Sequence, residues 1–124
     1  MRFHGICLIT NDVARLRGFY TTILQAEAEG DDTFTLLSTD GATLSIFSEE
    51  GMERMAPGST HATGSARYTL EFEVKDVNHE YERLKKMDVV FVKPPTTQAW
   101  GRRSVWFRDP DGNIINFFAK VDSG

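Results

Sequence analysis

The chain carries one pattern twice: a strand, a helix that opens at an aspartate, and a hairpin that turns at an Asp-Gly pair. In the first copy, FHGICLITND predicts a strand that leads at Asp12 into the helical segment VARLRGFYTTIL. Aspartate is a preferred N-cap because its carboxylate accepts hydrogen bonds from the free N–H groups of the first turn. The apolar residues that follow recur at helical spacing and form one stripe: Val13, Leu16, Tyr20 and Ile23.

The second copy repeats these signals. Residues 68–76, YTLEFEVKD, alternate as a strand does and lead at Asp76 into VNHEYERLKKM. The apolar stripe of this second helical segment consists of Val77, Tyr81, Leu84 and Met87. The sequence therefore predicts a second strand and a second capped helix.

A hairpin closes each copy. The segments FTLLSTDGATLSIF and SVWFRDPDGNIINFF both alternate around an Asp-Gly pair, a pair that favours tight turns. The distance from Asp12 to Asp76 is 64 residues, whereas the distance between the turn aspartates, Asp40 and Asp111, is 71 residues. The second copy therefore holds seven additional residues, which we place in a loop at KPPTTQAWGR.

Each copy is a βαβββ unit that is too small to bury its own sheet face. We therefore expect an α+β fold in which the two tandem units form a curved mixed sheet with helices on its outer face. The expected limits are about 1–48 for the first unit, about 49–65 for a linker and about 66–120 for the second unit, all within a single domain, 1–124. The linker is assigned from the polar, small-residue composition of EEGMERMAPGSTHATGS.

Composition narrows the class of protein. A chain of 124 residues can bury one moderate core, and a formal net charge of -4 argues against a nucleic-acid partner. No stretch approaches the roughly 18 apolar residues of a membrane span, and the N-terminus lacks a secretory signal pattern. Cys7 is the single cysteine, which fits a reducing compartment. We expect a cytoplasmic protein in which Cys7 packs as a small hydrophobe within ICLI.

The chain resembles the vicinal oxygen chelate superfamily, which includes glyoxalases, bleomycin resistance proteins, fosfomycin resistance enzymes and extradiol dioxygenases. The resemblance covers essentially the whole chain and is carried by Phe19 and Tyr20 in the capped helix and by WGRRSVWFRDPDGN. It implies the glyoxalase/bleomycin resistance fold and a homodimer, in which association would shelter sheet edges. It says little about chemistry, because one fold supports many functions.

Metal-dependent members of that superfamily take their ligands from the first and last strands of each unit. The first-strand ligand lies seven positions before the helix-opening aspartate, and here these positions hold Gly5 and Thr69. The last-strand ligand lies five positions after the turn aspartate, and here these positions hold Ser45 and Asn116. Glycine offers no side-chain donor, and the neutral oxygens of the other three are weak donors for a transition metal. We therefore expect no metal cofactor.

His4 is the residue that could restore a metal site, because a slip of one residue would bring it to the ligand position. Strand alternation opposes the slip, since one residue moves every side chain to the other face. Alternation predicts three pocket-facing residues: Gly5, Cys7 and Ile9. It turns the intervening residues toward the helices: His4, Ile6 and Leu8. The remaining histidines, His61 and His79, are expected in solvent.

The residues that would face the pocket favour small-molecule binding. Ser45, Thr69 and Asn116 offer neutral hydrogen bonds, and the glutamates at positions 71 and 73 add negative charge that suits a cation. Phe47 and Phe118 could sandwich a flat group or pack as core. The remaining residues expected to bind ligand are Gly5, Cys7, Glu71, Trp100 and Arg103.

Two classes of function remain open. The first is a metal-independent binding protein, similar to bleomycin resistance proteins, that sequesters a cationic aromatic compound or antibiotic. The second is an enzyme: either a glyoxalase-type lyase or dioxygenase that holds Zn, Ni, Fe or Mn through His4 and Glu71, or a metal-free enzyme with a buried Glu71 as general base. The missing ligand quartet favours binding.

Overall fold

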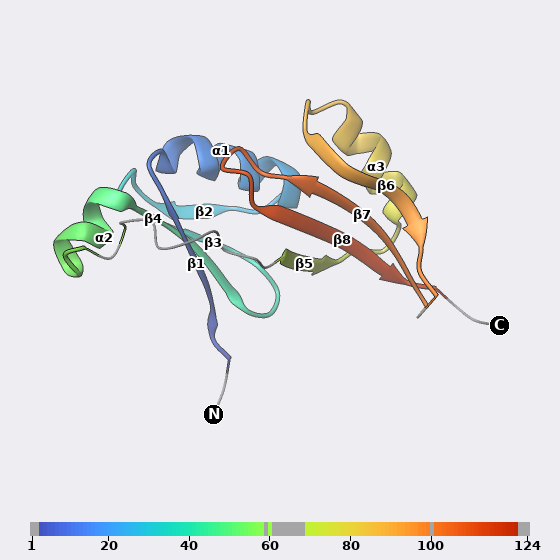
Figure 1. The fold of residues 1–124 in the computed structure, drawn as a ribbon, viewed down its shortest axis with the longest axis horizontal. Helices are drawn as coiled ribbons and strands as arrows, with labels where there is room; N and C mark the ends of the chain where they lie inside the picture. Colours follow the sequence, from blue (N-terminus) through green and yellow to red (C-terminus); the bar gives the residue numbers. More distant parts are fainter. Residues whose placement is uncertain (1–2, 59, 61–68, 100, 122–124) are drawn as a thin grey trace. The chain divides into compact units, whose positions relative to one another are not determined.

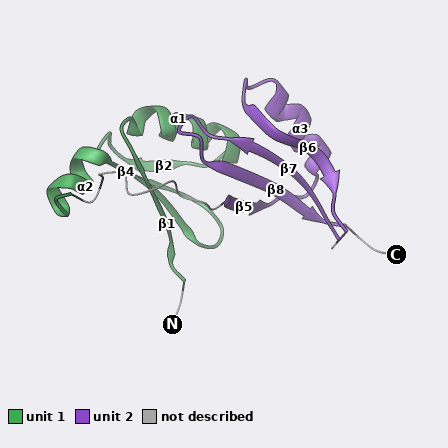
Figure 2. Ribbon diagram, in the orientation of Figure 1, with its two compact units in different colours: residues 1–65 green, residues 66–124 purple. Residues whose placement is uncertain are grey.

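The computed structural model describes residues 3–58, 60, 69–99 and 101–121. The chain divides into two compact units, residues 1–65 and residues 66–124 (Figure 2). Each unit holds one βαβββ pattern and one four-stranded mixed sheet. The predicted α+β fold of two tandem units is therefore confirmed.

The first unit contains a strand, a helix and then three strands (Figure 1): β1 (Gly5–Thr10), α1 (Val13–Leu24), β2 (Ala28–Gly30), β3 (Phe34–Leu37) and β4 (Thr43–Ser48). The strand order in its sheet is β1-β4-β3-β2. β1 and β4 run parallel, whereas the other two pairs are antiparallel. The first strand therefore pairs with the last strand of the hairpin and not with β2.

Helix α1 forms where the sequence predicts it. The Asp12 carboxylate accepts a hydrogen bond from the backbone N–H of Arg15 at 3.1 Å, which caps the helix. Gln25 ends the helix in the left-handed conformation with a φ of 51°. All four residues of the predicted stripe are buried: Val13, Leu16, Tyr20 and Ile23.

Burial alternates along β1, because α1 covers one face of the first sheet. Leu8 and Thr10 are buried on the helix side, together with residues from the hairpin such as Ile46. The opposite face carries four exposed side chains: Cys7, Ile9, Phe34 and Leu36. This face provides the candidate site.

Arg17 of α1 fixes the turn between β2 and β3. Its guanidinium donates hydrogen bonds to the backbone oxygen of Asp31 at 3.0 Å and to Thr35 Oγ1 at 3.2 Å. The backbone N–H groups of Phe34 and Thr33 donate to the Asp31 carboxylate and hold its pKa below the ordinary value. The turn thereby attaches β3, and the exposed side chains on it, to the helix.

A short helix, α2 (Glu49–Met55), follows β4 within the segment predicted to be the linker. The Ser48 hydroxyl accepts a hydrogen bond from the backbone N–H of Gly51 at 2.9 Å, and two glutamates lie in the first turn. The predicted linker therefore begins with a capped helix, which its overall polarity did not indicate. Residues 59 and 61–65 of the predicted linker lie outside the described residues.

The second unit repeats the arrangement (Figure 1): β5 (Thr69–Glu73), α3 (Val77–Lys85), β6 (Val90–Thr97), β7 (Arg102–Arg108) and β8 (Ile114–Lys120). Its strand order is β5-β8-β7-β6, with β5 and β8 parallel and the other pairs antiparallel. Across the ranges that the structure describes, no helix is long and apolar enough to cross a membrane.

Helix α3 is capped by Asp76, whose carboxylate accepts a first-turn backbone hydrogen bond at 3.1 Å. Val77 and Leu84 of the predicted stripe are buried, whereas Tyr81 is half-buried and Met87 lies beyond the last helical residue. Edge-to-face ring contacts connect the helix to the sheet, with centroids 5.0 to 6.5 Å apart: Tyr81 with Phe91, Phe91 with Phe107, and Phe107 with Phe117. The other face of this sheet carries Glu71, Asn116 and Trp106.

Strand β6 corrects the predicted loop. Residues 93–97 of KPPTTQAWGR belong to this edge strand, which has eight residues where β2 has three. Its pairing with β7 shifts register twice, between Phe91 and Lys93 and between Lys93 and Thr96. Prolines lack an N–H group and are tolerated at edges and bulges, so these shifts accommodate Pro94 and Pro95. The additional residues therefore lengthen an edge strand.

Candidate functional site

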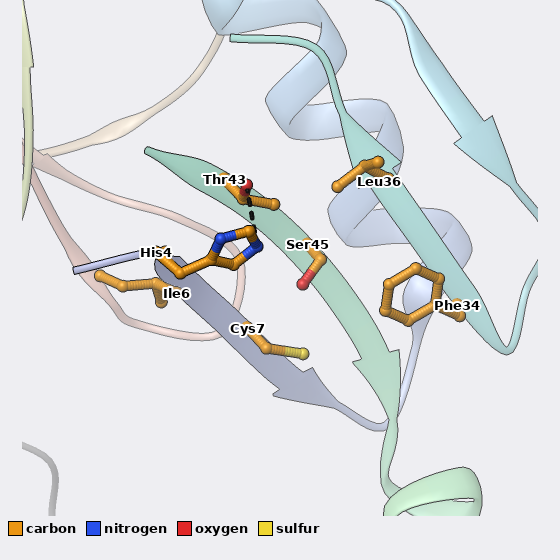
Figure 3. A pocket seen from close by; sticks show the side chains of 8 residues that line it. His4, Ile6, Cys7, Phe34, Leu36, Thr43 and Ser45 are labelled. Atoms are coloured by element: carbon orange, nitrogen blue, oxygen red, sulfur yellow. Dashed lines mark hydrogen bonds between the residues drawn. The ribbon is translucent and has the colours of Figure 1, made fainter. Parts of the chain in front are cut away.

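A pocket of about 450 Å³ lies on the face of the first sheet that is turned away from α1 (Figure 3). Its walls come from the segment at the start of β1 and from strands β3 and β4. Its size falls within the range of small-molecule sites. The residues that line it are His4, Gly5, Ile6, Cys7, Phe34, Leu36, Thr43 and Ser45.

Strand register brings these side chains together. Cys7 of β1 pairs with Ser45 of β4, and Ser45 pairs on its other side with Leu36 of β3. Residues that are paired directly across a sheet lie on the same face, so the three side chains form one row. Gly5 pairs with Thr43 in the next row. Three predicted site residues, Gly5, Cys7 and Ser45, therefore line one pocket.

The pocket has a mostly apolar wall and one serine hydroxyl. Ser45 is only 7 % exposed, and within the described residues its hydroxyl has no hydrogen-bond partner. Cys7 is exposed, so the expectation that it packs as a buried hydrophobe is wrong. Within the apolar run ICLI, Leu8 is buried, Ile6 is half-buried, and Cys7 and Ile9 are exposed, because α1 covers the other face of β1.

His4 and Ile6 also line this pocket, contrary to the prediction that both face the helices. Nε2 of His4 lies 3.4 Å from Thr43 Oγ1 (Figure 3). His4 precedes the first residue of β1, where strand alternation does not apply. Ile6 is half-buried and lies in the edge strand β1.

The pocket does not fit a metal ion. Gly5 stands at the ligand position of β1, and a Cβ added there would lie 2.1 Å from the backbone oxygen of Thr43. No side chain can occupy this position unless the strands move apart. Across the described part of the chain, no three His, Cys, Asp or Glu residues come together as a metal site would require.

Phe34 and Leu36 are the pocket residues that the sequence reasoning did not single out. They follow from the first hairpin, because counting back from its Asp-Gly turn pairs Leu36 with Ser45 and Phe34 with Phe47. Phe47, a predicted ligand-binding residue, does not line the pocket. Its ring contacts Phe34 edge-on at 6.0 Å and lies where a Cβ on Gly51 of α2 would project.

The second sheet holds four further predicted residues on its face away from α3: Thr69, Glu71, Asn116 and Phe118. Glu71 is exposed and pairs with Arg102 at 3.4 Å. The Arg102 guanidinium also lies over the Phe118 ring, 3.9 Å from its centroid. The burial that a metal-free general base at Glu71 requires is therefore absent, and one face of Phe118 is covered by a cation.

One predicted residue, Arg103, is not brought to this face. Arg103 lies on the α3 side of β7, where its guanidinium donates to Asn78 Oδ1 and Thr97 Oγ1, each at 3.0 Å. Trp100 lies outside the described residues, as does His61.

Asn116 is buried without full hydrogen bonding. It is 5 % exposed, and its Oδ1 has no hydrogen-bond partner among the residues that the structure describes. Trp106 is its direct neighbour across β7 and β8, and the Trp106 indole Nε1 is likewise buried without a partner. A polar group held at a cost in stability is typical of a functional position.

Replacing Asn116 by leucine, which has a similar shape, is expected to raise the free energy of unfolding by about 1 kcal/mol, because an acceptor without a partner is no longer buried. Urea unfolding measures the change. Asn116→Asp keeps the shape but buries a charge, so this control is expected to destabilise the protein. A destabilised Asn116→Leu variant would mean that Oδ1 is satisfied in solution.

Comparisons with known proteins agree with this architecture. Residues 2–117 match the sequence profile of the Glyoxalase/Bleomycin resistance protein/Dioxygenase superfamily. The chain is 26% identical over 125 residues to the uncharacterized protein YraH of Bacillus subtilis, with 95% of this chain and 98% of YraH covered. It is 25% identical over 127 residues to the bleomycin resistance protein of Geobacillus stearothermophilus, with 94% and 95% covered.

A solved structure gives the same fold. The crystal structure of a glyoxalase/bleomycin resistance protein/dioxygenase family enzyme from Burkholderia phytofirmans PsJN matches with a TM-score of 0.86 and 16% identity. The match covers 98% of this chain and 100% of that chain. At this identity the likeness concerns the fold and leaves the chemistry to the residues of the pocket.

Proposed function

The chain belongs to the glyoxalase/bleomycin resistance protein/dioxygenase superfamily, and on this basis we propose that it binds a small molecule without a metal. The proposed binding site is the pocket between β1, β3 and β4. The observation that carries the proposal is the composition of the pocket: apolar walls from Phe34, Leu36 and Ile6 around the hydroxyl of Ser45, a residue that is 7 % exposed. Apolar walls with a few placed polar groups are typical of ligand sites.

We propose a neutral, flat ligand. None of the residues that line the pocket carries a carboxylate or a fixed positive charge. The expected preference for a cationic compound depended on Glu71 and Glu73 of the second unit. Arg102 offsets the charge of Glu71 at 3.4 Å, which weakens that argument.

Benzylacetone, a neutral phenyl ketone, is a suitable probe because it offers a flat ring for the apolar wall and an acceptor for Ser45. We expect saturable heteronuclear NMR shifts at the backbone amides of Cys7, Leu36 and Ser45, with a dissociation constant of about 1 mM or tighter. The titration uses EDTA-treated protein and is repeated with zinc chloride. Equal affinities in the two titrations would support binding without a metal.

A pair of variants locates the binding. Leu36→Ser removes apolar wall and is expected to weaken benzylacetone binding about fivefold. Val92→Ser is the matched control, because Leu36 and Val92 are 37% and 42% exposed. Val92 lies on β6, outside the pocket, so its substitution is expected to leave benzylacetone binding unchanged. Shifts that do not saturate, or equal effects of both substitutions, would contradict the pocket.

The second candidate function is a metal-dependent glyoxalase-type or dioxygenase enzyme, which is supported by the family and by the position of His4 at the pocket. Its other expected ligand, Glu71, forms an ion pair with Arg102 in the second unit. Benzylacetone binding that appears only after addition of zinc, nickel, iron or manganese would favour this alternative. The homodimer expected from the resemblance remains a prediction.

A further inference from the structure

We propose that Cys7 makes this pocket a covalent trap for neutral aromatic enones, that is, α,β-unsaturated ketones with an aryl group. The inference rests on the proposed function, because the pocket must first hold the aromatic part of the compound. It adds a chemical class of ligand and a reaction at a named atom. The reaction is conjugate addition of the Cys7 thiol.

The Cys7 sulfur is open to a bound compound. Cys7 is exposed and lines the pocket, and it is the single cysteine of the chain. Figure 3 shows its side chain beside that of Ser45, on neighbouring strands and within the same pocket. A soft thiol nucleophile in an apolar, neutral pocket suits a soft, uncharged electrophile.

Ser45 is the second observation that points to a ligand. Its side chain is more than nine-tenths buried and lines the pocket, and the described part of the chain offers its hydroxyl no hydrogen-bond partner. This hydroxyl lines the pocket and is therefore free to donate a hydrogen bond to a ligand that accepts one. A carbonyl oxygen is such an acceptor.

The reaction balances without an oxidant or a reductant. The thiol of Cys7 gives its proton to water, and the sulfur attacks the β-carbon of the enone, where a C–S bond forms. The electron pair of the C=C bond moves toward the carbonyl, whose oxygen becomes negative. Ser45 Oγ–H donates to that oxygen, and the α-carbon then takes a proton from water. The net change is addition of the S–H group across the C=C bond.

The first test uses the unmodified protein and two enones that differ in one group. Benzylideneacetone carries a phenyl group where ethylideneacetone carries a methyl group. Intact-mass spectrometry gives the rate of adduct formation, and each rate is divided by that of N-acetylcysteine with the same enone. We expect this ratio to be about tenfold higher for benzylideneacetone, which corresponds to about 1.4 kcal/mol. Equal ratios would overturn the proposal.

The second test separates the role of Ser45 from simple exposure of the thiol. Ser45→Ala is expected to slow addition of benzylideneacetone about tenfold. The same substitution should leave alkylation by iodoacetamide unchanged, because that reaction develops no charge on a bound ketone oxygen. Ser104→Ala removes a buried serine of the second unit, 4 % exposed, and serves as the matched control. Equal slowing of both reagents by Ser45→Ala would contradict the assigned hydrogen bond.

A reversible ligand tests the proposed binding function separately from the proposed covalent addition at Cys7. Benzylacetone is the saturated analogue and cannot add to the thiol. If benzylacetone binds but benzylideneacetone gains no rate advantage, the covalent trap is wrong and the binding function stands. If neither effect is observed, both are wrong. The wild-type rates need no variant, so a poorly folded Ser45→Ala protein leaves the first test decisive.

Discussion

Replacing Gly5 by alanine is expected to lower the free energy of unfolding by about 2 to 3 kcal/mol. The added Cβ would lie 2.1 Å from the backbone oxygen of Thr43 and 2.8 Å from its Cβ. A backbone oxygen within a strand cannot rotate away, so the start of β1 must separate from β4. The separation limits the cost, because pairing from Ile6 onward can persist once His4 and Gly5 are released.

The matched control is Gly18→Ala. Gly18 lies in α1, and an added Cβ there meets nothing within 4 Å. Alanine is a better helix former than glycine, so this variant is expected to raise the free energy of unfolding, measured in urea, by about 0.5 to 1 kcal/mol. Both variants replace glycine by alanine. If one loses stability and the other gains it, the loss in Gly5→Ala comes from steric overlap and not from a general effect on the unfolded chain.

Hydrogen exchange shows where the Gly5→Ala variant responds. The backbone N–H of Thr43 donates to the backbone oxygen of His4 at 2.9 Å. This amide is expected to exchange faster in the variant, while amides farther along β4 keep their protection. Unchanged stability together with unchanged exchange at Thr43 would contradict the close approach of the two strands.

The same overlap means that a single substitution at residue 5 is not expected to supply a metal ligand. Histidine at residue 5 also carries a Cβ, so it would meet the Thr43 oxygen at the same 2.1 Å. We therefore expect Gly5→His to open the strand pair and not to create a metal site.

The elements with local signals were predicted well. Asp12 and Asp76 mark the starts of α1 and α3 because an N-cap acts on N–H groups within the same turn. The hairpins turn where the Asp-Gly pairs lie, and Gly41 and Gly112 adopt positive φ angles of 116° and 89°.

Features that depend on distant partners were missed. The exposure of Cys7 depends on which face of β1 the helix covers, and the apolar run alone does not show this. Pro94 and Pro95 indicated a loop, yet the edge position of β6 allows a strand. In each case the deciding contact lies outside the local sequence.

Replacing Asp109 by alanine is expected to lower the free energy of unfolding by about 3 kcal/mol, since hydrogen bonds to a buried charged group are among the strongest. Asp109 opens the Asp-Pro-Asp-Gly-Asn turn and is 5 % exposed. Its Oδ1 accepts from the backbone N–H groups of Asp111 and Asn113, each at 2.9 Å, and its Oδ2 accepts from Asn113 Nδ2 at 2.7 Å. Alanine would leave all three donors without this acceptor.

Two further variants grade the effect in urea unfolding. Asp109→Asn keeps one acceptor oxygen but sets an amide group against Asn113 Nδ2, so about half of the loss is expected. Asp40→Ala removes an exposed aspartate from the turn of the first hairpin and is expected to change stability by less than about 0.5 kcal/mol. If Asp109→Ala were as mild as Asp40→Ala, the carboxylate would not stabilise the turn. A large loss would instead show that the Asp109 carboxylate stabilises the turn between β7 and β8, a segment that carries part of the resemblance to the superfamily.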